Sequence, residues 1–228
     1  SRELIPGAHL CPGPGLRKWG RPHTMGDRPM PTPLHKFALS LFAFVAACVG
    51  PAALPVPDCE LFVLGVAQDG GLPHFGCDRA CCADARATGR VLYPASLGLV
   101  DHRQDKLLLV EATPRVEEQV AMLQRLAGVH GRGRQPVDAV LVTHAHIGHY
   151  LGLAWFGREV ASTQDLPVHC SQRFGAFLRE QAPWRQLVAL HQIDVREFTV
   201  GEAFSPWPGV SVLPVAVPHR DEFSDTMA

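Results

Sequence analysis

Short apolar runs, separated by turn-rich stretches, follow one another from residue 60 onward and predict a mixed α/β domain. Runs of this length with β-branched residues are typical of strands. They occupy residues 60–67, 94–101, 106–112, 137–143, 166–170 and 209–217. The run 137–143 is continuously apolar, which predicts a strand buried on both faces. Because strands and helices are mixed along the chain, we expect layers in which helices cover the faces of a sheet.

Three segments have helical signatures. Residues 113–128 repeat apolar side chains every three to four positions, with Thr113 as an N-cap, Pro114 at the first helical position and Gly128 as the stop. A second helix is expected from about Tyr150. A third is expected over residues 171–182.

The first 55 residues are expected to lie outside the folded domain. Residues 37–47 form an apolar stretch that follows Lys36 and ends in small residues, which is typical of a secretory signal. The stretch is shorter than the roughly 20 residues that span a bilayer. Cys48 could be lipidated as in a lipoprotein signal, or could be incidental to ordinary cleavage. We therefore expect an exported protein, either periplasmic or anchored to the membrane as a lipoprotein.

These features divide the chain into three parts. Residues 1–29 are rich in Gly, Pro and Arg, and they are expected to be an unstructured upstream extension because Met25 or Met30 could be the true start. Residues 30–55 are expected to be the signal peptide and residues 56–228 the folded domain.

Charge supports this division. Lys and Arg number 21 and Asp and Glu 22, which gives a net charge of −1, but the first fifty residues carry +4 and the rest −5. A near-neutral balance argues against a nucleic-acid binder, which would carry a basic surface. A small molecule is the expected substrate.

The unusual feature of the composition is its 12 histidines. His144, His146 and His149 lie in VTHAHIGHYLGL, directly after the buried strand. Alternate residues of an extended loop point the same way, so His144 and His146 can face one ion, and His149 can face the same cavity from the next helix. Imidazole ligands with one open position are typical of catalytic zinc. The alternative is a chance cluster of solvated histidines.

VTHAHIGHYLGL resembles the H-x-H-x-D-H motif of the metallo-β-lactamase superfamily. The stretch from VLGVAQDGGLPHFGC to VPHRDEFSD is similar to its branch related to pyrroloquinoline-quinone biosynthesis protein B. The resemblance implies an αββα sandwich with metals at one edge between two sheets. It also implies that His144, His146 and His219 hold a first ion and that His149 holds a second, which makes His149 a candidate catalytic residue as well.

The chain departs from this family pattern in two places. Gly148 stands where the family usually has a metal-binding Asp, which puts a site with two ions in question. The family's later Asp and His would follow Ala228, so we expect a domain truncated at its C-terminus, and such a fragment could be inactive. Asp221, Glu222 and Asp225 could orient ligands, or could be ordinary turn carboxylates.

The resemblance implies a metal-dependent hydrolase that uses metal-bound hydroxide on an ester, lactone, amide or phosphodiester bond. One or two Zn²⁺ ions are the expected cofactor, with iron as an alternative. Two other functions stay open. One is a protein like its biosynthetic relative, acting in oxidation or carriage of a quinone precursor, and the other is a metal-binding relative without catalysis.

A second cluster of potential ligands follows the first predicted strand. His74, Cys77, Cys81 and Cys82 lie close together and could hold a structural zinc ion. The alternative is a disulfide that joins Cys81 or Cys82 to Cys77 or Cys59, since an exported protein meets oxidising conditions. Cys170 is expected to be a small buried residue rather than a nucleophile.

Overall fold

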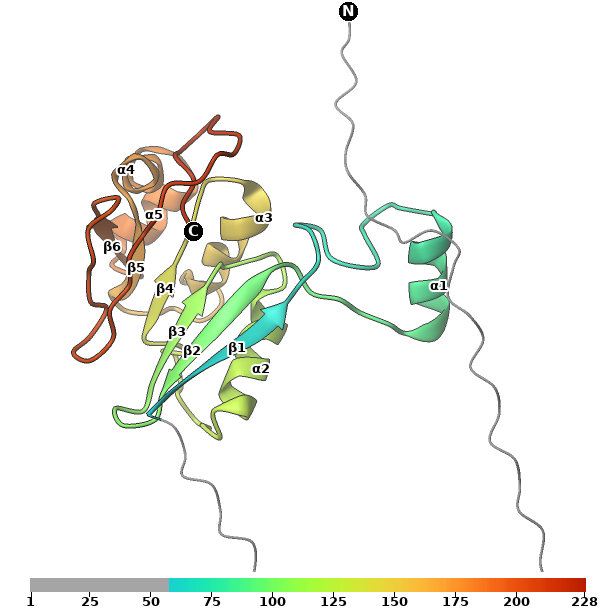
Figure 1. The fold of residues 1–228 in the computed structure, drawn as a ribbon, viewed down its shortest axis with the longest axis horizontal. Coiled ribbons are helices and arrows are strands. Elements are labelled where there is room, and N and C mark those ends of the chain that lie inside the picture. The colour runs from blue at the N-terminus through green and yellow to red at the C-terminus, as the bar shows by residue number, and fades with distance from the viewer. Residues whose placement is uncertain (1–57) are drawn as a thin grey trace, which may run out of the picture. The chain divides into compact units, whose positions relative to one another are not determined.

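The computed structural model describes residues 58–228, which fold around one six-stranded sheet (Figure 1). The strands are β1 (Cys59–Gly65), β2 (Ser96–Asp101), β3 (Lys106–Val110), β4 (Ala139–Leu141), β5 (Leu166–Ser171) and β6 (Ile193–Phe198). Their order in the sheet follows the sequence. The first three strands are antiparallel, and β3 to β6 are parallel to one another.

Parallel neighbours need crossover connections, and helices supply them. The helices are α1 (Ala80–Thr88), α2 (Val116–Leu126), α3 (Ile147–Tyr150), α4 (Gln172–Glu180) and α5 (Trp184–Ala189), with a 3₁₀ helix at Leu151–Phe156 directly after α3. Figure 1 shows α1 projecting away from the sheet. No helix among residues 58–228 is long and apolar enough to cross a membrane.

The sheet has a core on each face. The larger core joins Leu107, Leu109 and Val140 to side chains of α2, α4, α5 and the 3₁₀ helix. The smaller core joins Leu108, Ala139 and Leu141 to Trp207 and its neighbours after β6. Alternate residues of a strand point to opposite faces, so β4 contributes to both cores. The predicted burial of this strand on both faces is therefore confirmed.

The prediction of a layered α/β fold is confirmed, and so are most of its strands. The predicted strand 209–217 is wrong. That region makes isolated bridges, Phe204 to Val212 and Ala216 to Met227, instead of a ladder. Pro214 lies in the middle of the run and has no N–H to donate. Within residues 58–228 there is one sheet, so the second sheet of the predicted sandwich is not part of the described structure.

The predicted helices differ at their ends. The helix expected from Pro114 begins at Val116, because the Thr113 side chain accepts the N–H of Arg115 and holds a turn there. The helix expected over 171–182 is α4, capped by Ser171, whose Oγ accepts the N–H of Phe174. The predicted leader, including Cys48, Met25 and Met30, lies outside the described residues.

His169 is a buried histidine beside the smaller core, where a positive charge is unfavourable. Its ring is stacked on Phe204 at 4.9 Å, and its Nε2 is buried without a hydrogen-bond partner. Burial, helped by the charge of Arg196, lowers its pKa to about 4. Cys170 beside it is fully buried, as predicted, and burial raises the pKa of its thiol to about 12.

We expect the free energy of unfolding to fall as pH drops from about 6.5 to about 4. In that window His169 is protonated in the unfolded chain but neutral in the folded chain, so lowering the pH favours unfolding. His169→Phe should flatten this part of the profile. Urea unfolding of both proteins at pH 4.5 and 7 measures the difference, and an unchanged difference between the two pH values would contradict the assignment.

Candidate metal centre

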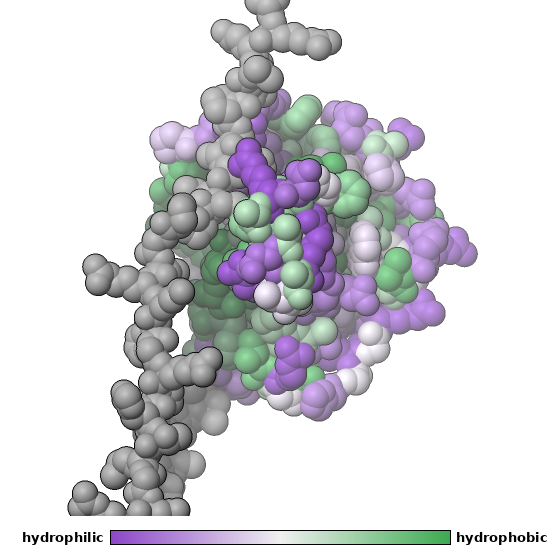
Figure 2. Space-filling model, turned by 90° about the vertical axis from the view of Figure 1, so that its right-hand side faces the viewer, coloured by the Kyte–Doolittle hydropathy of each residue, from purple (hydrophilic) through white to green (hydrophobic). Residues whose placement is uncertain are grey.

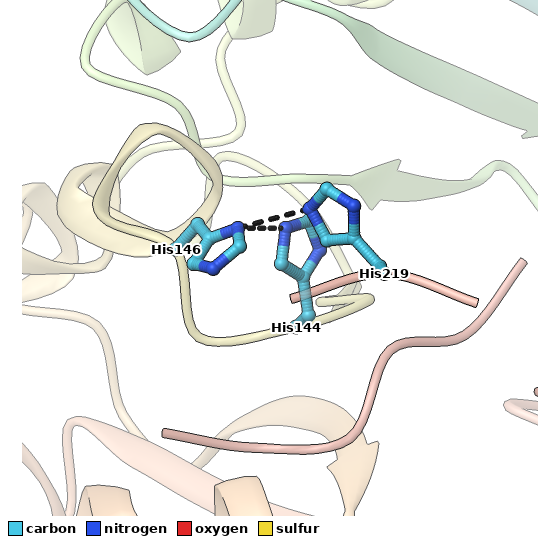
Figure 3. Close-up of side chains that lie close together, drawn as sticks. All are labelled: His144, His146 and His219. Atoms are coloured by element: carbon cyan, nitrogen blue, oxygen red, sulfur yellow. Dashed lines mark hydrogen bonds between the residues drawn. The ribbon is translucent and has the colours of Figure 1, made fainter. Parts of the chain in front are cut away.

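Three histidines from two distant segments converge at the end of β4. His144 and His146 lie on the loop between β4 and α3, and His219 lies on the C-terminal segment (Figure 3). The two segments are tied by backbone contacts, since Met227 N–H donates to Thr143 O at 3.2 Å and Ala145 N–H donates to Ser224 Oγ at 2.8 Å. We call His144, His146 and His219 the histidine triad.

The nitrogens of the triad point toward one another. His146 Nδ1 lies 2.9 Å from His144 Nε2 and 3.1 Å from His219 Nε2. All three donor atoms lie within 4.8 Å of one another. Two nitrogens bound at about 2.1 Å to one tetrahedral Zn²⁺ are about 3.4 Å apart. The triad thus has the donor type and nearly the spacing that zinc requires.

The electrostatics of His144 also suit a ligand. Its side chain is buried, and burial followed by the neighbouring rings of His149, His146 and His219 lowers its pKa to about 3. A metal binds the neutral form of imidazole, so a histidine that stays neutral gives up no proton when it binds. His144 is therefore ready to bind at neutral pH.

His149 lies beside the triad but outside it. Its ring centroid is 4.2 Å from that of His144. Its Nε2 is 3.3 Å from Asp69 Oδ1, and its Nδ1 is 3.3 Å from Glu111 Oε2. Burial alone would lower the pKa of His149, but the two carboxylates outweigh it and raise the pKa to about 9. The same contact with His149 lowers the pKa of Asp69 to about 2.

Asp69 and Glu111 were missed by the sequence reasoning. Asp69 lies in the turn-rich loop after β1, where a carboxylate is unremarkable. Glu111 directly follows β3, is 5% exposed, has a left-handed backbone (φ 72°) and accepts the N–H of Thr143 at 3.2 Å. A carboxylate at the end of an apolar run is costly to bury unless it is paired, and that was the available signal.

The triad, His149 and Asp69 all line one cavity of about 470 Å³. The remaining lining includes His74, Thr143, Arg220 and Met227. The cavity is polar and contains both signs of charge. Its volume lies within the range of small-molecule binding pockets.

Of the three acidic residues near His219, one contacts the triad. Glu222 Oε2 lies 2.9 Å from His146 Nε2, and this hydrogen bond lowers the pKa of the Glu222 carboxyl. A carboxylate on the far nitrogen fixes the orientation of a metal-binding imidazole. Asp225 instead accepts from Ser171 Oγ, and Asp221 accepts from Thr226 Oγ1 at 2.9 Å. Those two are structural carboxylates.

The predicted cluster of His74, Cys77, Cys81 and Cys82 lies around the start of α1. Figure 2 shows this side of the domain, where hydrophilic and hydrophobic side chains are interspersed. Cys59, Cys77 and Cys82 are free thiols, so the expected disulfide to Cys77 or Cys59 is wrong. Cys81 is disulfide-bonded, and a disulfide sulfur is not a thiolate ligand. Cys82 Sγ accepts the N–H of His74 at 3.4 Å.

These contacts also bear on the structural zinc expected at the same place. Among residues 58–228, only the histidine triad brings three or more potential donor atoms close enough together to hold one ion. His74, Cys77, Cys81 and Cys82 do not form such a group among these residues, and the structural zinc expected there stays a prediction. His74 instead lines the cavity of the triad.

Comparison with known proteins places this site in a family. Residues 106–227, which contain the whole triad, match the family described as the beta-lactamase superfamily domain. The chain belongs to this superfamily. Among its curated relatives, coenzyme PQQ synthesis protein B of Methylobacterium nodulans is 27% identical over 163 residues, covering 71% of this chain and 53% of the relative. The protein of the same name from Rhizobium meliloti is 27% identical over 165 residues, covering 72% and 52%.

This superfamily member therefore spans about half the length of the curated relatives that it matches. Two solved structures share its fold. Zn²⁺-bound PqqB from Methylobacterium extorquens has a TM-score of 0.58 and 24% identity, covering 69% of this chain and 56% of that one. A diphosphatase of the PhnP family has a TM-score of 0.52 and 24% identity, covering 74% and 60%. The predicted metallo-β-lactamase fold is confirmed.

Proposed function

We propose that this protein is a metal-dependent hydrolase that cleaves an ester, lactone, amide or phosphodiester bond of a small molecule. The observation that carries the proposal is the convergence of three imidazole nitrogens, His144 Nε2, His146 Nδ1 and His219 Nε2, on one wall of a polar cavity. An ion held there would supply Lewis acidity and an activated water near neutral pH. Zinc suits an all-imidazole donor set, and iron is the alternative.

The chain's own groups have separate roles in this proposal. Glu222 orients His146 through its far nitrogen. Glu111 does the same for His149 from the buried side. Arg220 lines the cavity and can pair with an anionic group of the substrate. Asp69 and His149 form a carboxylate–imidazole pair next to the triad, 3.3 Å apart.

The proposal is tested by removing the metal. The purified full chain should contain about one or more transition-metal ions and should hydrolyse members of a panel of p-nitrophenyl esters, lactones and bis(p-nitrophenyl) phosphate. Dialysis against EDTA should lower the rate at least about 100-fold, and added Zn²⁺ should restore it, because the ion supplies several kcal/mol of stabilisation. Hydrolysis that survives complete removal of metal would refute the proposal.

A second candidate is favoured by the relatives, which are named for synthesis of coenzyme PQQ. In that case the protein would act on a quinone precursor, by oxidation or by carriage. Iron in the purified protein, with no turnover on the hydrolase panel, would favour this function. Tight metal binding with neither activity would instead indicate a binding protein without catalysis.

A further inference from the structure

The side chain of Asp69 occupies the space beside Gly148. A Cβ atom built on Gly148 would lie 2.1 Å from Asp69 Cβ and 2.6 Å from Asp69 Cγ. Real Cβ atoms do not approach other atoms this closely, so a side chain at position 148 and the present position of Asp69 exclude each other. The glycine that departs from the family motif thus makes room for a carboxylate from a loop 79 residues earlier.

The carboxylate of Asp69 and the ring of His149 form a pair of donor atoms at the cavity. Asp69 Oδ1 and His149 Nε2 are 3.3 Å apart, close to the roughly 3.4 Å that separates two ligands of one tetrahedral ion. The Asp69 side chain is 53% exposed, so an ion can reach it from solvent. Both residues line the cavity that contains the triad.

Glu111 acts on the same pair from the protein interior. Its side chain is 7% exposed, and its Oε2 is 3.3 Å from Nδ1 of His149, opposite to Asp69 on the ring. Neither of these two atoms has a partner in hydrogen-bond geometry. A small rotation of the His149 ring would place the Nδ1 proton on Glu111. Nε2 would then present its lone pair to the cavity beside Asp69.

We infer that Asp69 and His149 form a second metal site, in which Asp69 supplies the carboxylate that residue 148 lacks. The ligand class is a divalent transition-metal ion next to the one held by the triad. This inference rests on the metal centre of the proposed function, but not on the reaction that the centre performs. Asp69 was not among the residues that the sequence motif indicated.

Zinc counting tests the inference. The full chain is stripped of metal and then dialysed against a graded series of free Zn²⁺ concentrations. Its zinc content, measured by inductively coupled plasma mass spectrometry, should reach two ions per chain. Asp69→Ala and Asp69→Asn should keep the ion of the triad and bind the second at least about 100-fold more weakly, since loss of even an outer partner costs 10–100-fold. Asp165→Asn is the matched control, because Asp165 forms an exposed pair with His191 at 3.1 Å.

A second variant tests the same site with the carboxylate still in the chain. Gly148→Ala should displace Asp69 and weaken the second ion in the same way, while the zinc of the triad reports that the domain is folded. Two ions in both Asp69 variants, or one ion in the wild type, would overturn the inference. Two ions without hydrolysis would refute the proposed function and leave the second site standing.

Discussion

Replacing His144 with alanine should lower hydrolysis by at least about 1,000-fold and abolish tight binding of zinc at the triad. His144 is the central ring of the site, with centroids of His149, His146 and His219 between 4.2 and 4.9 Å away. It is 6% exposed, and its replacement by alanine removes one of the three donor nitrogens of the triad. Loss of several kcal/mol of transition-state stabilisation corresponds to this factor in rate.

The measurements are kcat/KM on the best substrate of the panel and zinc content at a fixed free concentration. His191→Ala is the control, since its side chain is 79% exposed and pairs with Asp165 at the surface. That variant should match the wild type in both measurements. Wild-type rate and one tightly bound ion in His144→Ala would show that the triad is not the metal centre.

The triad illustrates what can be predicted from a local pattern. His144 and His146 were predictable because both follow a continuously apolar run, and β4 holds that run in the core on both faces. Alternation along the extended loop then determines that the two rings face one side. His219 lies more than 70 residues later, and only the family resemblance connected it to them.

Asp69 and Glu111 could not be predicted in this way. The role of Asp69 depends on the packing of the loop after β1 against α3, and that of Glu111 on the end of β3 meeting the same helix. Sequence periodicity does not report such contacts. The absence of a side chain at Gly148 was visible in the sequence and was interpreted as the loss of a ligand. The structure instead shows a carboxylate in that space, because a glycine lets a distant loop approach closely.

Local sequence patterns also predicted only part of the fold. The strands predicted from apolar, β-branched runs are present up to β5, and β4 and β5 are the most deeply buried of them. α1, α5 and β6 were missed. β6 exposes Arg196 and Glu197 in succession, which breaks the alternation expected of a strand. The run 209–217 has the composition of a strand, but Pro214 has no N–H to continue a ladder.

The loop that carries Asp69 depends on another glycine, Gly65, at the end of β1. The register of β1 with β2 shifts between Val63 and Gly65. Immediately after this shift, the N–H groups of Val66 and Ala67 both donate to Tyr93 O, at 3.1 and 2.9 Å. A Cβ on Gly65 would lie 1.9 Å from Pro94 O and 2.7 Å from Tyr93 O. These are backbone atoms, so the clash cannot be relieved by turning a side chain.

Gly65→Ala should therefore lower the free energy of unfolding by about 3 kcal/mol, at the upper end of the cost of overpacking. Gly128→Ala is the comparison, since that glycine has a left-handed backbone (φ 67°) but open space around it and should cost about 1 kcal/mol. Urea unfolding measures both. The hydrogen bonds from Val66 and Ala67 to Tyr93 O also position the loop that carries Asp69. The folded Gly65→Ala protein should therefore bind the second zinc more weakly than the Gly128→Ala protein. If both variants lose the same free energy of unfolding and bind zinc equally, β1 can shift away from Tyr93 and Pro94 without disturbing the metal site.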